Sequence, residues 1–201
     1  MRLGILGGTF DPVHYGHLDA ADAARQACSL DRILFIPSLD PPHKPADPHA
    51  SAFDRFAMAA LALDGRPGDD VSDMELRRTG PSYTVTTLRE LHGQGWAPGQ
   101  LHFIIGTDAF AEIATWYDYP TVLDCANFVV ISRQGAEVAG GGSPATSTGI
   151  YHVEARTRDV SSTLIRSRLA AGGTIDDLVP SAVARYIRAH HLYGATDDQH
   201  G

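Results

Sequence analysis

Two histidines stand three residues apart near the start of the chain, directly after a glycine turn. The segment reads Gly7-Gly8-Thr9-Phe10-Asp11-Pro12-Val13-His14-Tyr15-Gly16-His17. This spacing places both imidazoles on one side of the first turn of a helix. Because helix N-termini favour anions through their N–H groups and the helix dipole, the segment predicts a phosphate site at which His14 and His17 donate hydrogen bonds.

Two other phosphate motifs do not fit this segment. A dinucleotide fingerprint needs the pattern G-x-G-x-x-G, and Gly4, Gly7 and Gly8 lack that spacing. A Walker A loop needs a lysine after its last glycine, and the one lysine of the chain is Lys44. The ordinary alternative, one capping and one packed histidine, is disfavoured by the glycine turn that precedes the pair.

A second anion-binding pattern comes late in the chain, at Val160-Ser161-Ser162-Thr163-Leu164-Ile165-Arg166. Ser161 or Ser162 is placed to cap a helix whose N–H groups can face phosphate. Arg166 follows one turn later as a forked donor. Standing alone, the segment would indicate no more than a serine-capped helix.

The elements that must position these residues alternate between strand and helix. We expect strands at 3–6, 32–36, 101–105, 127–131 and 151–153, and helices at 16–27, 52–63, 85–91, 161–169 and 181–190. Short apolar strands in this alternation predict an α/β protein with a doubly wound parallel sheet, in a three-layer α/β/α arrangement. Loops are expected at the proline-rich 37–50 and the low-complexity 135–149, and 1–201 is expected to form one domain.

Ligands on such a sheet bind beyond the carboxyl ends of the strands. Four predicted strand ends carry unusual residues: Gly7-Gly8-Thr9, Pro37 to Lys44, Gly106-Thr107-Asp108 and Ser132-Arg133. We expect all four to face one crevice. Since fifteen of the sixteen basic residues are arginines, Lys44 stands out as a position that uses a compact ammonium.

Composition limits the partners. The 201 residues include 16 Lys plus Arg against 24 Asp plus Glu, a net charge of -8, which argues against an extended nucleic-acid partner but not against a local basic pocket. Cys28 and Cys125 form neither a disulfide framework nor a zinc site, which favours a reducing, cytoplasmic location. No apolar run reaches about 18 residues, so we expect no membrane partner.

Together, the two segments resemble the signatures of the HxGH nucleotidyltransferases, relatives of class I aminoacyl-tRNA synthetases. Val160 replaces the first Ile of that family's I-S-S-T-x-I-R signature. Further motifs resemble bacterial nicotinate-nucleotide adenylyltransferases, over nearly the whole chain; they are Pro41-Pro42-His43-Lys44, Gly80-Pro81-Ser82-Tyr83-Thr84, Gly106-Thr107-Asp108, Trp116, Ile131-Ser132-Arg133 and the stretch from Tyr186 to Tyr193. Thr107, where Ala is commoner, and the 135–149 segment depart from the pattern.

The resemblance implies transfer of the adenylyl group of ATP to nicotinate mononucleotide, giving nicotinate adenine dinucleotide and pyrophosphate, in NAD biosynthesis. It implies catalytic roles for His14, His17, Lys44 and Arg166. It implies that ATP is bound by Gly8, Thr9, Phe10, His17, Gly106, Asp108, Ser162, Thr163 and Arg166. It implies that nicotinate mononucleotide is bound by Lys44, Tyr83, Thr84, Thr87, Trp116 and Arg133. Mg²⁺ is expected as a cofactor held mainly by ATP phosphates, with no dedicated protein ligands.

Three alternatives stay open. Pantetheine-phosphate adenylyltransferases share both signatures, but they usually carry Thr at the first histidine and lack the Pro-Pro-His-Lys and Pro-Ser-Tyr-Thr segments. An adenylyltransferase that prefers nicotinamide mononucleotide is the second alternative, and a non-catalytic nucleotide sensor on the same fold is the third. The sequence also leaves a homo-oligomer open.

Overall fold

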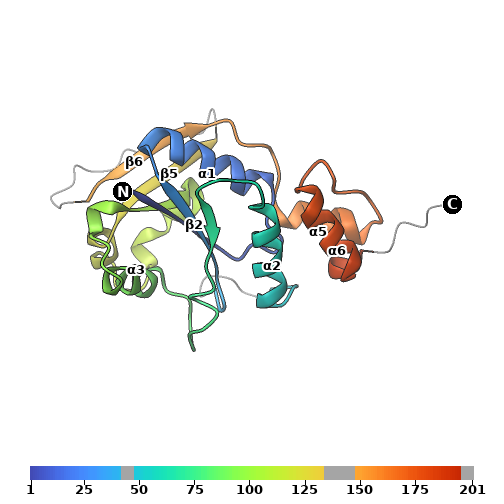
Figure 1. Ribbon diagram of the computed structural model, residues 1–201, viewed down its shortest axis with the longest axis horizontal. Coiled ribbons are helices and arrows are strands. Elements are labelled where there is room, and N and C mark those ends of the chain that lie inside the picture. Colours follow the sequence, from blue (N-terminus) through green and yellow to red (C-terminus); the bar gives the residue numbers. More distant parts are fainter. Residues whose placement is uncertain (42–47, 134–147, 196–201) are drawn as a thin grey trace.

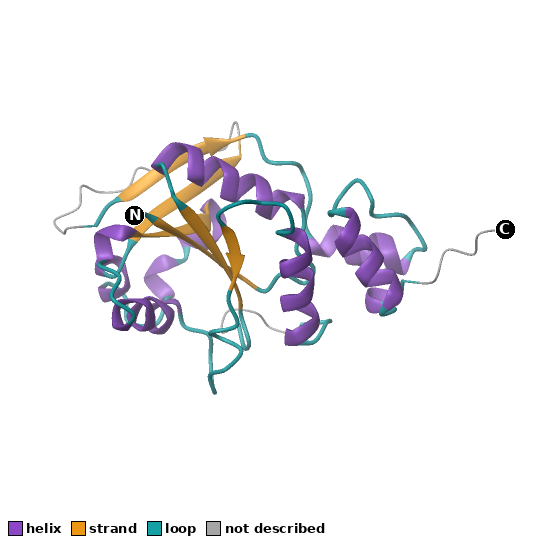
Figure 2. Cartoon of the chain, viewed as in Figure 1, coloured by secondary structure: helices purple, strands orange, loops and turns teal. Residues whose placement is uncertain are grey.

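The computed structural model describes residues 1–41, 48–133 and 148–195, and a parallel sheet of six strands lies at its centre (Figure 1, Figure 2). The strands are β1 (Leu3–Gly8), β2 (Arg32–Pro37), β3 (Asp69–Val71), β4 (Leu101–Gly106), β5 (Asn127–Arg133) and β6 (Ile150–Ala155). Their order is β3-β2-β1-β4-β5-β6, and every neighbouring pair is parallel. The predicted doubly wound parallel sheet is confirmed.

Helices cover both faces of this sheet. They are α1 (Tyr15–Cys28), α2 (Ala52–Ala62), α3 (Thr84–Gly93), α4 (Thr107–Ala111), α5 (Ser162–Ala170) and α6 (Ser181–Ala189). Short 3-10 turns are η1 (Pro98–Gln100), η2 (Ile113–Thr115), η3 (Thr121–Asp124) and η4 (Leu192–Gly194). In Figure 1, α1 crosses one face, α3 lies on the other, and α5 and α6 lie beside α2 at one end of the molecule.

Alternation along the strands divides the apolar side chains between two cores. Leu6 packs in one core with Leu18 of α1, whereas Ile5 packs in the other with Leu88 of α3. Successive side chains of a strand point to opposite faces, so a fully buried strand must be apolar at every position. This confirms the three-layer α/β/α arrangement.

The strand order reverses at β1. Leu3 pairs with Arg32 of β2 on one side and with Leu101 of β4 on the other. In an open α/β sheet this reversal opens a crevice beyond the carboxyl ends of the two central strands. The ends of β1 and β4, Gly8 and Gly106, therefore flank the expected binding position.

The structure adds elements that the sequence pattern did not predict. The edge strand β3 holds one apolar residue, Val71, and forms by pairing with β2. Helix α4 is only five residues long, too short to show a period. The helix start left open between two serines is settled, because the Ser161 hydroxyl accepts a hydrogen bond from the Leu164 amide at 3.1 Å.

Most of the loop expected at 135–149 lies outside the described residues. None of the helices within the described ranges has the length and apolar character that crossing a membrane requires.

Candidate active site

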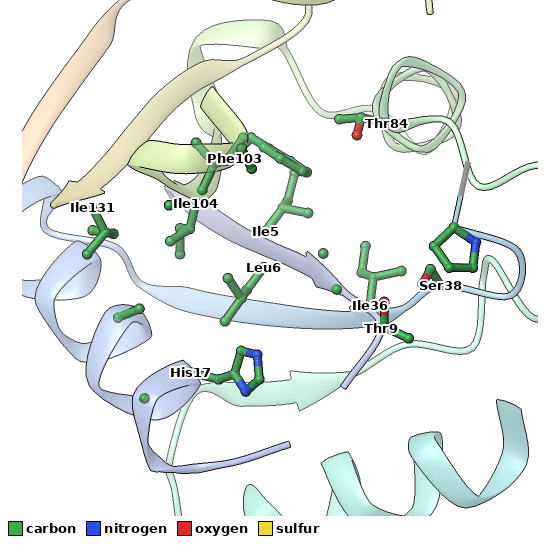
Figure 3. A pocket seen from close by; sticks show the side chains of 18 of the residues that line it. Ile5, Leu6, Thr9, His17, Ile36, Ser38, Thr84, Phe103, Ile104 and Ile131 are labelled. Atoms are coloured by element: carbon green, nitrogen blue, oxygen red, sulfur yellow. The ribbon is translucent and has the colours of Figure 1, made fainter. Parts of the chain in front are cut away.

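A cavity of about 400 Å³ lies at the carboxyl ends of the central strands (Figure 3). Its floor comes from β1, β2, β4 and β5, one wall from α1 and the residues just before α5, and the other from α3 and the 109–116 segment. In Figure 3, His17 reaches in from α1 and Thr84 lies at the start of α3, with the strand residues between them. Of the predicted site residues, the lining includes Gly8, Thr9, His14, His17, Thr84, Thr87, Gly106 and Trp116.

The histidine pair begins α1 and lines this cavity. The two rings stack, with centroids 3.8 Å apart and planes 27° apart. The His14 backbone N–H donates to His17 Nδ1 at 3.2 Å. Because Nδ1 accepts, geometry assigns the proton of the neutral His17 ring to Nε2, which can then donate to a ligand.

Two neighbouring residues hold the pair in place. A Cβ at Gly16 would come within 3.1 Å of His14 Nδ1, so glycine makes room for that ring. The ring of Phe10 meets His17 edge-on, with centroids 5.0 Å apart, and lies 3.2 Å from where a Cβ of Gly8 would stand. Phe10 is buried, so its side chain supports the wall from behind.

On the opposite wall, aromatic rings surround the start of α3. Tyr83 precedes the helix, and its ring stacks on Tyr117 with centroids 4.4 Å apart. Trp116 lines the cavity and meets Phe103 edge-on, with centroids 6.0 Å apart. This wall offers an aromatic face and helix N–H groups, which suits a flat ring that carries a carboxylate.

Thr87 lines the same wall, but its hydroxyl already has protein partners. It donates to Glu75 and accepts from Arg78 Nη2 at 2.7 Å. Glu75 also lines the cavity, and burial raises the pKa of its carboxyl against the opposing effects of Thr87, Ser82 and Arg78. Thr87 can therefore donate to a substrate carboxylate only by releasing Glu75.

The end of β4 leaves room for a ligand. A Cβ built on Gly106 would meet no atom within 4 Å, so the fold itself does not require glycine there. Asp108 is exposed in the first turn of α4, between the lining residues Gly106 and Ala109. This position lies at the cavity rim, where a ligand hydroxyl could approach it.

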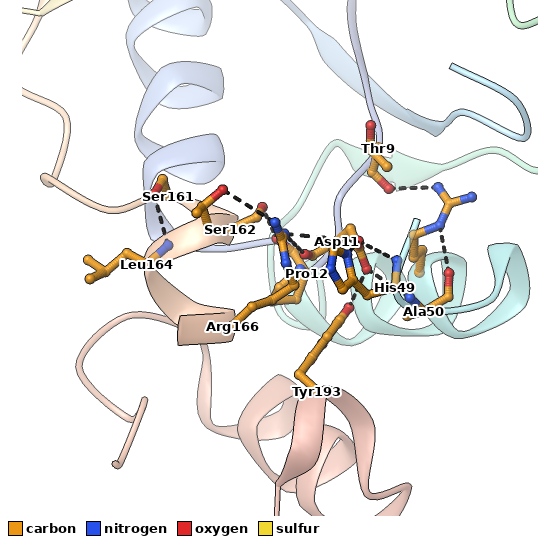
Figure 4. A network of polar contacts seen from close by, with 12 residues as sticks. Thr9, Asp11, Pro12, His49, Ala50, Ser161, Ser162, Leu164, Arg166 and Tyr193 are labelled. Carbon is orange, nitrogen blue, oxygen red and sulfur yellow. Dashed lines mark hydrogen bonds and ion pairs between the residues drawn. The ribbon is translucent and has the colours of Figure 1, made fainter. Parts of the chain in front are cut away.

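The late signature binds the first motif directly (Figure 4). Ser162 Oγ donates to the Pro12 carbonyl at 2.9 Å, and Arg166 Nη1 donates to the Asp11 carbonyl at 2.7 Å. Arg166 Nη2 also donates to Thr163 Oγ1 at 3.3 Å. The two signatures, far apart in sequence, thus form one structural unit, although Ser162, Thr163 and Arg166 lie outside the cavity lining.

Two predicted residues cannot be placed. Lys44 lies outside the described residues, although Pro41, three positions earlier, lines the cavity. The backbone N–H of Leu39 donates to Ser82 Oγ at 3.0 Å, so the start of that loop lies against the Pro-Ser-Tyr-Thr motif. Arg133 ends β5, and its side chain is not among those described.

Sequence reasoning missed two arginines near the site. Arg158 lines the cavity; its guanidinium contacts Asp19 at 3.0 Å and lies 3.8 Å above the Tyr15 ring. Arg55 is 1% exposed and donates to the carbonyls of Thr9 and Ser38, both at 2.7 Å. The signal for Arg55 was available, because it stands on the buried stripe of α2 with Met58, Ala59 and Ala62.

Comparison with known proteins agrees with this geometry. Residues 5–168 match the cytidylyltransferase-like family model. A probable nicotinate-nucleotide adenylyltransferase of Roseiflexus sp. (strain RS-1) is 44% identical over 195 residues, covering 95% of this chain and 97% of its own. One from Desulfatibacillum aliphaticivorans is 39% identical over 218 residues, covering 96% of this chain and 100% of its own.

Solved structures share the fold. Plasmodium falciparum nicotinic acid mononucleotide adenylyltransferase, complexed with NaAD, superposes with a TM-score of 0.73 at 20% identity, covering 96% of this chain and 97% of its own. A putative nicotinate-nucleotide adenylyltransferase of Vibrio parahaemolyticus gives 0.66 at 18% identity, covering 96% of each chain. The family match and the curated relatives show that the chain belongs to the cytidylyltransferase-like family and, within it, to the nicotinate-nucleotide adenylyltransferases.

Proposed function

We propose that this chain transfers the adenylyl group of ATP to nicotinate mononucleotide, forming nicotinate adenine dinucleotide and pyrophosphate. One observation carries the proposal: a single cavity is lined by the stacked His14 and His17 and also by Thr84 and Trp116. Figure 3 shows His17 on α1 and Thr84 at the start of α3, with the strand residues between them. Relatives at 39 and 44% identity that span this chain almost completely are named for the same activity.

In the proposed reaction, a phosphate oxygen of nicotinate mononucleotide attacks the α-phosphorus of ATP. The new P–O bond forms as the bond to pyrophosphate breaks, and pyrophosphate leaves with the electron pair. No protein nucleophile takes part, so the chain contributes positioning and charge stabilisation. The Nε2–H of His17 is the donor that this geometry offers to the phosphates.

The remaining roles are assigned from the sequence resemblance. ATP lies against the end of β1, the start of α1 and Gly106, and nicotinate mononucleotide lies against Thr84 and Trp116. Lys44, Arg133 and Arg166 stay in the proposal as phosphate donors, with Asp108 as a ribose acceptor. The positions of Gly106 and Trp116 in the cavity lining support this division.

Mg²⁺ is proposed to enter with ATP. Among the described residues, no group of three or more His, Cys, Asp or Glu side chains could hold a metal ion. Glu75, the carboxylate found in the cavity lining, is engaged by Thr87 and Arg78. An Mg²⁺ ion that entered with ATP would be held through phosphate oxygens and water, and it would supply positive charge against the triphosphate.

An acceptor comparison tests the proposed function. Purified protein is given ATP and Mg²⁺ with nicotinate mononucleotide, nicotinamide mononucleotide or phosphopantetheine, and pyrophosphate and the dinucleotide product are measured. We expect the highest kcat/KM with nicotinate mononucleotide. Faster turnover of phosphopantetheine would indicate a pantetheine-phosphate adenylyltransferase instead. Faster turnover of nicotinamide mononucleotide would indicate an adenylyltransferase that prefers the amide. Binding of ATP without pyrophosphate release from any acceptor would indicate a nucleotide sensor.

Removing the aromatic face tests the acceptor wall. We expect Trp116→Ala to raise the KM for nicotinate mononucleotide about tenfold, because loss of a buried aromatic contact costs roughly 1 kcal/mol or more. The KM for ATP should change far less, and both values come from steady-state pyrophosphate release. Trp96→Ala is the matched control, because Trp96 packs on the same core but does not line the cavity. Equal increases in both KM values would indicate a structural role for Trp116.

We further propose that residues 1–201 form one domain, in the cytoplasm. One of the two apolar cores draws its side chains from positions between Leu6 in β1 and Ala195, near the end of the described chain. Because distant parts of the sequence share this core, it supports a single folding unit. The thiols of Cys28 and Cys125 are both buried and unbridged, which fits a reducing compartment.

A further inference from the structure

The Asp11 carboxylate lies buried in the turn that leads from β1 to the histidine pair (Figure 4). Its Oδ2 accepts from the His49 backbone N–H at 2.8 Å, and its Oδ1 accepts from that of Ala50 at 3.1 Å. Arg166 Nη1 lies 4.0 Å from Oδ2. Asp11 is three residues before His14. Contacts that hold its carboxylate therefore also restrict the backbone that leads to His14 and His17.

A fourth partner of Asp11 comes from the far end of the described chain. The hydroxyl of Tyr193 in η4 donates to Asp11 Oδ1 at 2.8 Å, across 182 residues of sequence. In Figure 4 the Tyr193 side chain points from the C-terminal segment toward Asp11. Burial and the nearby carboxylate raise the pKa of Tyr193, so its hydroxyl keeps its proton and stays a donor over the whole physiological range.

The backbone around Tyr193 adopts a costly conformation. His191 has a φ of 49° and Tyr193 a φ of 58°, both in the left-handed region that non-glycine residues avoid. Such a residue is strained, and the strain persists only where surrounding contacts hold the backbone in place. The turn at η4 brings the Tyr193 hydroxyl to Asp11, and the resulting hydrogen bond is one of the contacts that hold this backbone.

We propose that Tyr193 is a positioning residue for the reaction, which acts through the Asp11 carboxylate to hold the turn at residues 9–14. Two carbonyls of that turn are also held by hydrogen bonds: Ser162 donates to the Pro12 carbonyl and Arg55 donates to the Thr9 carbonyl. The inference rests on the proposed function, because the turn ends at His14. Through this contact, the turn at η4 helps to position the histidine pair.

The chain offers a matched control for this contact. Tyr186 in α6 also donates its hydroxyl to a carboxylate, Asp54 Oδ1 in α2, at 2.9 Å. Both tyrosines tie the C-terminal region to the rest of the fold with one hydrogen bond of nearly equal length. They differ in that Asp11 belongs to the catalytic turn, whereas Asp54 lies in the first turn of α2.

The test compares Tyr193→Phe with Tyr186→Phe. Each variant loses one hydroxyl, and we expect Tm to fall by a few degrees, about equally, in both. Tyr193→Phe should lower kcat about tenfold with both KM values within about twofold of wild type, because a small misplacement costs turnover more than binding. Tyr186→Phe should keep the wild-type kcat. Equal kcat values in the two variants, or a rise in KM at unchanged kcat, would overturn the proposal.

A double-variant cycle tests the route through Asp11. Asp11→Asn should lower kcat more than Tyr193→Phe, because the carboxylate serves all the partners of the turn. If Tyr193 acts through Asp11, the double variant should be no slower than Asp11→Asn alone. Fully additive losses would show that Tyr193 acts by another route.

A readout without turnover separates this inference from the proposed function. Imidazole NMR resonances of His14 and His17 should shift in Tyr193→Phe and stay in place in Tyr186→Phe. If the wild type fails to join ATP to nicotinate mononucleotide, the proposed function fails, and these resonances still decide whether Tyr193 positions the turn. Unchanged resonances in both variants would reject the positioning role.

Discussion

His17→Ala should lower kcat by about two to three orders of magnitude, the loss expected when one donor to developing negative charge is removed. The reason is geometric. Its Nδ1 accepts the His14 backbone N–H at 3.2 Å, so the neutral ring carries its proton on Nε2, and the residue lines the cavity. Because the interaction strengthens as charge spreads over the phosphates, kcat falls more than the affinity for ATP.

The measurement is steady-state pyrophosphate release, with circular dichroism to confirm the fold. His17→Gln is informative because its amide N–H₂ can partly replace the Nε2–H donor, so its kcat should lie between those of wild type and His17→Ala. His190→Ala is the control, since this exposed histidine stacks on Tyr186 in α6 and does not line the cavity. A near-normal kcat in His17→Ala would remove His17 from the catalytic residues.

The sequence predicted the parts of the fold and site that depend on local pattern. Apolar runs predicted β1, β2, β4 and β5, because strands buried on both faces must be apolar throughout. The edge strand β6 was also predicted, over 151–153, although several of its residues are exposed. The three-residue spacing of His14 and His17 predicted that they share one side of the first helical turn, and they stack there. The prediction failed for β3, whose two aspartates carry no strand signal and whose pairing with β2 creates the strand.

Long-range partners were outside the reach of such patterns. The sequence assigned Arg166 to phosphate, yet in the structure it donates to the Asp11 carbonyl, 155 residues away. Thr87 was assigned to the substrate, and its hydroxyl donates to Glu75. No local rule pairs Asp11 with Tyr193, because that contact depends on the turn of η4 and on where α6 ends. These contacts depend on tertiary packing, which residue spacing alone does not predict.

The second large effect is expected on stability, at Arg55. This guanidinium is 1% exposed and donates to three carbonyls, those of Thr9, Ser38 and Ala50. It therefore joins the ends of β1 and β2 to the segment that precedes α2. Burial lowers the pKa of Arg55, and the Asp11 carboxylate opposes this decrease, so the group stays protonated as the counter-charge of Asp11.

Arg55→Ala should lower the free energy of unfolding by about 3–5 kcal/mol, because it removes a large, fully buried side chain and one of the positive charges near the buried Asp11 carboxylate. The three carbonyls also lose this donor, and each buried unsatisfied group adds to the cost. Denaturant unfolding followed by tryptophan fluorescence measures the change. Arg185→Ala, at an exposed position in α6, is the control and should change stability by less than about 0.5 kcal/mol.

Arg55→Lys separates charge from geometry. A lysine ammonium keeps the counter-charge for Asp11, but it cannot span three carbonyls as a planar guanidinium does. If the planar geometry of the guanidinium matters, Arg55→Lys should recover only part of the stability that Arg55→Ala loses. Its kcat should also fall, because the Thr9 carbonyl belongs to the turn at residues 9–14 that leads to His14. Full recovery in Arg55→Lys would show that Arg55 serves as a charge alone. A loss below about 1 kcal/mol in Arg55→Ala would show that water or neighbouring donors replace it.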